Sequence, residues 1–322
     1  MSGQPASLLS PRVLLPFALV TLIWGSTWIV IKGQLGIVPP SWSVAYRFAV
    51  AAIAMFAFAA LRREPLWLDR RAMAFALLLG IAQFTFNFNF VYRAEQHITS
   101  GLVAVLFALL IVPNTLLGRA FLKTPLEGRF LTGAGIAIAG VGLMILHEYR
   151  AAALGAGEVL LGTALTLAGV LSASAANVMQ GTRIARAQPM VVMIAWAMAF
   201  GALADGSYAW ITTGPPVIEP TAAYLGGVLY LGIVASAVTF PLYFNVIRAV
   251  GPGQAAWSSV LIPIIAMGFS TAFEGYRWAT LSIAGGVVAL IGLVIAVAKR
   301  PERPSVSGNT VSVPVSREDR LP

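Results

Sequence analysis

Residues 79–81 (LGI) and 134–145 (AGIAIAGVGLMI) are echoed in the second half of the chain by residues 231–233 (LGI) and 284–295 (AGGVVALIGLVI). Gly101 and Pro113 also have counterparts, Gly253 and Pro263. Glycine, alanine and leucine are common here, so a single match carries little weight. A shared offset of about 150 residues is what an internal repeat produces. The sequence therefore predicts that one half of the chain is a copy of the other.

The composition is that of a membrane protein. Of the 322 residues 58% are hydrophobic and 10% are charged, and the mean hydropathy is +0.84. A water-soluble domain of this size could not bury so much apolar surface. The net charge of +9 comes from basic residues in short loops and a tail, which indicates membrane orientation and not a nucleic-acid surface. The chain has no cysteine, so disulfides and cysteine-bound metals are excluded.

Ten apolar stretches are each long enough to cross most or all of about 30 Å of hydrocarbon as a helix. They are Val13–Ile31, Ser41–Leu61, Ala72–Tyr92, Thr99–Gly118, Phe130–Leu146, Val159–Met179, Met190–Trp210, Ala222–Val246, Gln254–Phe273 and Trp278–Ala298. The predicted fold is an all-α integral membrane protein of ten transmembrane helices. Residues 1–153 form a first five-helix repeat and residues 154–300 a second. The polar residues 301–322 are predicted to be a disordered cytoplasmic tail.

The basic residues predict the orientation. With ten spans, both termini lie on one side; sixteen Lys and Arg residues fall on that side and four on the other, with Arg47 inside a span. Positively charged loops stay in the cytoplasm, so both termini are predicted to be cytoplasmic. Five is an odd number, so the second repeat must be inverted relative to the first. Inverted repeats around a midplane site are the architecture of transporters that work by alternating access.

Short motifs resemble a known family. Trp24-Gly25-Ser26-Thr27-Trp28 resembles the opening of the drug/metabolite transporter superfamily, and Tyr46-Arg47-Phe48 fits it as well. The run Ala94–Leu102 is similar to the connection between helices 3 and 4 of the ten-helix EamA-type members, and among these the chain looks most similar to the YddG-type amino-acid exporters. Leu122-Lys123-Thr124 departs from the Gly-Glu pair that the family often has, whereas Phe273-Glu274-Gly275 keeps the acidic residue.

Polar and aromatic residues recur at helical spacing on several spans, and such faces turn away from lipid. The candidate substrate-binding residues are Trp24, Thr27, Trp28, Gln83, Asn87, Ser174, Asn177, Ser236, Thr239, Tyr243 and Trp257. We expect them to line one central cavity, with Tyr243 and Trp257 near its inner end. The alternative is that they only join neighbouring helices. Asn89 is rotated about 200° from Asn87 and should point away from this face.

Few charges lie inside the spans. Asp205 is the candidate coupling residue, although an acid at the membrane interface is an alternative. Arg47 is expected to be structural, either reaching toward the outer surface or bonding carbonyls at a helix end. The small residues Gly135 and Ala139, with Gly285 and Ala289, predict close packing of the fifth and tenth helices.

The reading that these features favour is an exporter of small amphipathic metabolites, most of all amino acids, in a bacterial-type inner membrane. The resemblance to amino-acid exporters and the uncharged, aromatic cavity both support this substrate class. The alternative is a membrane-embedded enzyme acting on a lipid or a peptide. Such an enzyme would need a buried serine with a histidine or a cluster of metal ligands, but the two histidines, His97 and His147, lie at helix ends on the outer side. With no P-loop, ATP drive is not expected. No metal, cofactor, catalytic residue or nucleic-acid partner is predicted, and the oligomeric state is left open.

Overall fold

The computed structural model describes residues 10–123, 126–151, 155–250 and 257–297, and these residues fold into helices without strands. The first half contains α1 (Pro11–Lys32), α2 (Pro40–Leu61), α3 (Arg70–Gly80), η1 (Ile81–Phe86), α4 (Asn87–His97), α5 (Ser100–Ala108), α6 (Ile111–Leu122) and α7 (Gly128–Ala151). The second half contains α8 (Ala156–Gln180), α9 (Arg183–Arg186), α10 (Met190–Thr213), α11 (Ala222–Leu229), η2 (Tyr230–Val238), α12 (Thr239–Val250), α14 (Ser258–Phe273) and α15 (Thr280–Val297). The predicted tail at 301–322 and the start of the ninth span at Gln254 lie outside the described residues.

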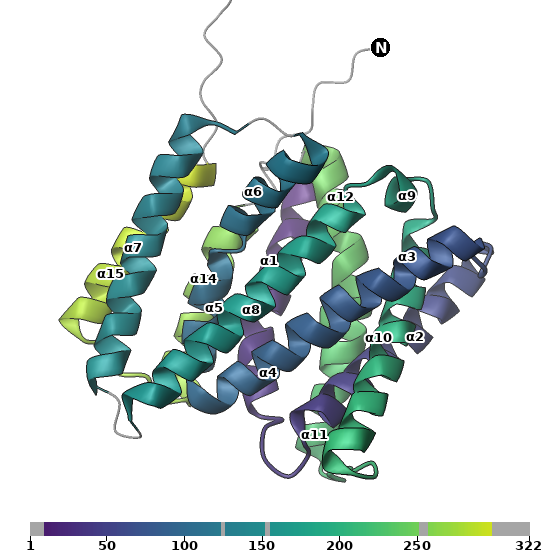
Figure 1. Ribbon diagram of the computed structural model, residues 1–322, viewed down its shortest axis with the longest axis horizontal. Coiled ribbons are helices and arrows are strands. Elements are labelled where there is room, and N and C mark those ends of the chain that lie inside the picture. The colour runs from purple at the N-terminus through teal and green to yellow at the C-terminus, as the bar shows by residue number, and fades with distance from the viewer. Residues whose placement is uncertain (1–9, 124–125, 152–154, 251–256, 298–322) are drawn as a thin grey trace, which may run out of the picture.

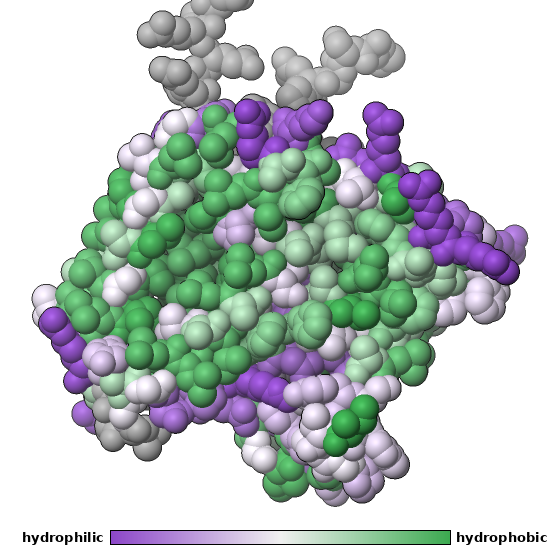
Figure 2. Space-filling view, viewed as in Figure 1, coloured by the Kyte–Doolittle hydropathy of each residue, from purple (hydrophilic) through white to green (hydrophobic). Residues whose placement is uncertain are grey.

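Nine of the helical stretches in the described ranges are long and apolar enough to cross a membrane, and Ser258–Phe273 is a shorter apolar helix. Large side chains such as Leu15, Leu171 and Leu203 are exposed on their outer faces. Figure 2 shows the resulting band of hydrophobic surface, with hydrophilic groups gathered above and below it. Exposed apolar surface on this scale suits lipid and not water. The prediction of an all-α membrane protein is therefore confirmed.

Contacts between helices follow an approximate two-fold relation between the halves. Helix α1 packs against α12 as α8 packs against α4, and α1 packs against α14 as α8 packs against α6. The segment η1 packs on α10 as η2 packs on α2, while the pairs α2–α10 and α7–α15 each join a helix to its own counterpart. In Figure 1 the α7–α15 pair forms one side of the molecule and α2, α3 and α10 the other, with α1, α8, α12 and α14 between them.

Glycines hold α7 against α15, but not all of them are the predicted ones. A Cβ added to Gly140 would lie 2.2 Å from the backbone N of Ala289, and one added to Gly292 would lie 2.2 Å from the backbone N of Ala137. Gly285 is also in this contact, as predicted, because its Cβ would lie 2.7 Å from the carbonyl of Gly140.

The prediction for Gly135 and Ala139 was wrong. Both are exposed, and a Cβ on Gly135 would meet nothing within 4 Å. The symmetry of the contacts instead matches Gly133 with Gly285 and Gly140 with Gly292. Residues of α7 therefore correspond to residues of α15 at the offset that relates 79–81 to 231–233. The sequence match of 134–145 with 284–295 had suggested a slightly shorter offset.

Two stretches of π-helix interrupt the membrane helices at corresponding places. Ile81–Phe86 lies inside the long helix 70–97, and Tyr230–Val238 lies inside the long helix 222–250. When 231–233 is aligned with 79–81, the second stretch overlaps the first. Side chains in η2 and just after it bond to the carbonyl five residues back: Ser236 Oγ donates to Leu231 O over 2.8 Å, and Thr239 Oγ1 donates to Val234 O over 2.6 Å. π segments of this kind occur often at functional sites.

An acidic residue of the second half caps a helix of the first half. Helix α5 begins at Ser100, whose backbone N and Oγ donate to the carboxylate of Glu274 over 3.2 Å and 2.9 Å. Ser270 Oγ donates to the same carboxylate. A carboxylate at a helix N-terminus satisfies free N–H groups and opposes the helix dipole. Glu274 therefore joins the end of α14 to the break between α4 and α5.

Candidate functional site

Four of the predicted site residues have buried polar atoms with no hydrogen-bond partner in the described part of the chain. The atoms are Trp28 Nε1, Gln83 Oε1, Asn87 Oδ1 and Ser174 Oγ. They come from α1, η1, α4 and α8. Leaving such an atom unpaired inside a protein costs about 1–3 kcal/mol. A cost of this size calls for an explanation, and a polar ligand that pairs with these atoms is one.

Two of these residues are linked by the ring of Phe107. The rings of Trp28 and Phe107 lie 5.1 Å apart. A Cβ added to Gly169 would lie 3.5 Å from both Phe107 Cζ and Asn87 Oδ1. Gly169 therefore lets α8 approach α4 and α5 closely, and Trp28 and Asn87 both lie near the ring of Phe107. Aromatic walls with a few polar groups are typical of small-molecule sites.

Tyr243 connects Trp24, in the middle of α1, to a buried cluster near the N-terminal end of that helix, where Trp257 also packs. The rings of Trp24 and Tyr243 are 4.9 Å apart, and Trp24 Nε1 donates to the carbonyl of Ala235 over 3.2 Å. Tyr243 and Trp257 pack on the buried cluster of Val13, Phe17 and Val246. These contacts join α1 to α12 and to the start of α14. Tyr243 and Trp257, the two residues expected at the inner end, thus pack on the same buried cluster.

The other predicted residues make polar contacts of their own. Thr27 Oγ1 donates to the carbonyl of Trp24 over 2.7 Å, and Asn177 Nδ2 donates to Asn114 Oδ1 over 3.4 Å. Ser236 and Thr239 are fully buried and donate to carbonyls of η2. A place for these four in a single cavity remains a prediction.

Arg47 lies in the interior, so the expectation that it reaches outward was wrong. It is 2% exposed, and its Nε and Nη2 donate to Ser236 Oγ, both over 3.4 Å. Its guanidinium carbon is 4.3 Å from the ring centre of Phe88 and 5.2 Å from that of Phe48. Stacking on aromatic rings stabilises a buried cation. The Arg47 side chain stays inside the bundle because Phe48 of α2 and Phe88 of α4 offer aromatic rings and Ser236 of η2 offers a hydroxyl.

Asp205 is fully buried and does not lie at an exposed interface. Its Oδ1 accepts a hydrogen bond of 2.8 Å from Asn89 Nδ2, while Oδ2 has no partner in the described residues. Asn89 Oδ1 accepts from Ser41 Oγ over 2.6 Å, and Ser41 Oγ accepts from Arg93 Nη2 over 3.1 Å. This network joins α2, α4 and α10. Asn89 points away from Asn87 and toward these helices, as predicted.

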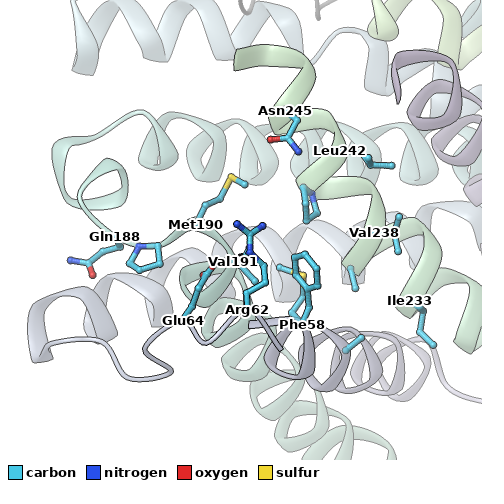
Figure 3. Close-up of a pocket in the computed structure, with 15 residues that line it drawn as sticks. Phe58, Arg62, Glu64, Gln188, Met190, Val191, Ile233, Val238, Leu242 and Asn245 are labelled. Carbon is cyan, nitrogen blue, oxygen red and sulfur yellow. Dashed lines mark ion pairs between the residues drawn. The ribbon is translucent and has the colours of Figure 1, made fainter. Parts of the chain in front are cut away.

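A further pocket, of about 670 Å³, lies between α2, the start of α10, η2 and α12 (Figure 3). Its wall consists of Ala54, Met55, Phe58, Arg62, Glu64, Gln188, Pro189, Met190, Val191, Ile233, Ala237, Val238, Pro241, Leu242 and Asn245. The predicted site residues do not line it. Helix α12 turns Tyr243 toward Trp24 and turns Leu242 and Asn245 toward the pocket. The mostly apolar wall gave no polar pattern in the sequence by which to find it.

Known proteins resemble this chain over most of its length. The model of the EamA-like transporter family matches residues 12–146 and, a second time, residues 160–298. Protein PagO of Salmonella typhimurium is 24% identical over 88% of this chain and 92% of its own length. A probable amino-acid metabolite efflux pump of Escherichia coli is 25% identical over 86% of this chain and 92% of its own. The uncharacterized inner membrane transporter YedA of Escherichia coli is 28% identical, over 88% and 92%. A crystal structure that covers 88% of this chain and 95% of its own has a TM-score of 0.64 at 20% identity, which shows the fold.

Proposed function

This chain belongs to the EamA-like transporter family, and on that premise we propose that it exports small amphipathic metabolites, most of all amino acids, by alternating access. It is a multi-pass protein of a bacterial inner membrane, and its family and named relatives are transporters and not enzymes. The proposed direction and substrate class are supported by the relative described as a probable amino-acid metabolite efflux pump. The membrane-embedded enzyme is set aside.

The observation that carries the proposal is the set of unpaired polar atoms on Trp28, Gln83, Asn87 and Ser174. The indole N–H donates, a hydroxyl does both, and an amide side chain has one oxygen that accepts and an NH₂ that donates. Such a set can bind an ammonium and a carboxylate at once. The rings of Trp28 and Phe107 supply an apolar wall for the rest of the solute.

The aromatic group of Trp24, Tyr243 and Trp257 is proposed as the inner gate. In the present arrangement these residues pack α12 and the start of α14 against α1, between its middle and its N-terminal end. Separation of these rings would open a path from the cytoplasm, provided that both termini lie on that side. Asp205 is the proposed coupling residue, because one of its carboxylate oxygens is buried without a partner in the described part of the chain.

Purified protein in proteoliposomes tests the proposal. Efflux of radiolabelled phenylalanine should require the protein and should fall at least fivefold in the Gln83→Ala and Asn87→Ala variants. Thr132→Ala is the matched control, because Thr132 is exposed on α7 and donates to its own helix. Phenylalanine flux no faster than in empty liposomes, with a panel of other neutral amino acids equally silent, would refute the substrate class.

A further inference from the structure

The pocket between α2, α10 and α12, with a volume of about 670 Å³, has Arg62, Glu64 and Gln188 on one side, Asn245 on another, and apolar residues in most of the remaining wall (Figure 3). Arg62 and Glu64 form an ion pair there, with Nε and Oε1 3.2 Å apart. Gln188 and Asn245 add two amide side chains to the wall. Figure 3 shows Arg62 projecting from the end of α2 into the space between the residues of α10 and those of α12. The guanidinium is therefore directed into the pocket and not along the outer surface.

The charges on the Arg62 side of the pocket have both signs. The side chain of Arg62 is 59% exposed and that of Glu64 is 21% exposed, so each retains polar surface that a solute can reach. The guanidinium carbon of Arg62 lies 5.5 Å from the ring centre of Phe58, which limits the directions in which it can point. A carboxylate fits the donors of Arg62, and an ammonium fits the acceptors of Glu64. An anion alone would be repelled by Glu64, and a cation alone by Arg62. A zwitterion complements both.

The interior of the pocket suits an apolar side chain. Its wall includes Met55, Phe58, Val238 and Leu242; Met55 is fully buried, whereas Phe58 and Val238 are exposed at the mouth of the pocket. The volume lies within the range of about 300–1,000 Å³ that small-molecule sites occupy. A pocket with both charges on one side and an apolar wall elsewhere complements a neutral amino acid that has an apolar side chain.

The inner end of the pocket approaches the polar centre of the protein. Ala237 lines the pocket, and the adjacent Ser236 accepts the hydrogen bonds of Arg47. A solute in the pocket would therefore be separated from the buried centre by the wall of η2. The segment that separates the pocket from the buried centre is thus a π-helix, whose geometry departs from that of the α-helices on either side.

We propose that this pocket is a capture site, apart from the central site, for a zwitterionic amino acid with an apolar side chain. The carboxylate of the solute binds Arg62, its ammonium binds Glu64, and its side chain packs on Phe58 and Leu242. The inference rests on the proposed function, and it places first contact with the substrate on the side of the Arg62–Glu64 loop, where four of the sixteen basic residues lie.

Inside-out membrane vesicles expose this face to the medium and so test the inference. The probe is L-phenylalanine, with phenethylamine and 3-phenylpropionate as competitors that lack the carboxylate and the ammonium. In Arg62→Gln and Glu64→Gln, the KM for phenylalanine uptake should rise about tenfold, the equivalent of about 1.4 kcal/mol, while kcat stays unchanged. In wild type phenylalanine should compete far better than phenethylamine, and Arg62→Gln should abolish that preference.

Arg70→Gln is the matched control, because it removes the same charge from an exposed site that does not line the pocket. It should keep the wild-type KM. Equal KM values in wild type, Arg62→Gln and Glu64→Gln would overturn the capture site and leave the transport function intact. If wild-type vesicles took up neither phenylalanine nor any other neutral amino acid of the panel, the proposed function would fail and this inference with it. Competition by phosphatidylethanolamine for phenylalanine bound to delipidated protein would assign the pocket to a lipid and would also overturn it.

Discussion

The contact of α7 with α15 predicts a large effect from a single methyl group. A Cβ added by Gly140→Ala would lie 2.2 Å from the backbone N of Ala289 and 2.6 Å from the carbonyl of Gly285. Ordinary contact begins at 3.4 Å, so overpacking would force the helices apart by roughly 1.2 Å. Both opposing atoms belong to the backbone and cannot rotate aside. Overpacking costs about 1–3 kcal/mol, and we expect about 3 kcal/mol here.

The assay is thermal unfolding of the purified protein in detergent. At about 2–4 °C per kcal/mol, the melting temperature of Gly140→Ala should fall by roughly 6 °C or more. Gly292→Ala should behave alike, because its Cβ would meet the backbone N of Ala137 at the same 2.2 Å. The control is Gly135→Ala, which meets open space and should stabilise the helix by up to about 1 kcal/mol. Equal melting temperatures for Gly140→Ala and Gly135→Ala would refute the packing argument.

Three further predictions concern topology, the central site and the Asp205 network. An impermeant thiol reagent added to intact cells should label Gly36→Cys and not Leu68→Cys, because the basic loops are predicted to face the cytoplasm; the reverse pattern would invert the topology. Gln83→Ala should slow efflux in proteoliposomes by a factor that corresponds to about 1–3 kcal/mol, and unchanged efflux at equal reconstitution would exclude its amide from the site. Asn89→Ala should lower the melting temperature more in the wild-type background than in Asp205→Asn, because the loss comes from a buried carboxylate that no longer has a donor; equal losses would show that the 2.8 Å bond is not responsible.

The membrane fold could be predicted because few backbone conformations are stable in lipid. Backbone groups in hydrocarbon must pair within their own segment, so each long apolar stretch has to be a helix. The approximate spans and the number of helices followed from this alone. The π segments could not be foreseen, because the polar faces were counted at about 3.6 residues per turn. Inside η2 the side-chain bonds of Ser236 and Thr239 reach back five residues.

Details of packing were harder to predict for two reasons. The sequence match paired Gly135 with Gly285, two positions away from Gly133, the residue that the contacts pair with it. Gly133 and Gly135 look equivalent in a run of small residues, and only the helix contacts distinguish them. Arg47 was expected to seek the membrane surface, because the sequence does not show that Phe48, Phe88 and Ser236 surround it. For the central site, residue spacing found four side chains with unpaired atoms, whereas the pocket at Arg62 has an apolar wall with no periodic signal.

The matching π segments also say something about ancestry. Two halves that share the same irregularity at equivalent positions inherited it from one five-helix chain. In an inverted pair the two halves enter the membrane in opposite directions, so a five-helix ancestor that formed such a pair with a copy of itself would have to insert both ways. A chain that inserts both ways needs nearly balanced basic loops. The sixteen-to-four asymmetry predicted for the present chain instead fixes one orientation for the fused protein.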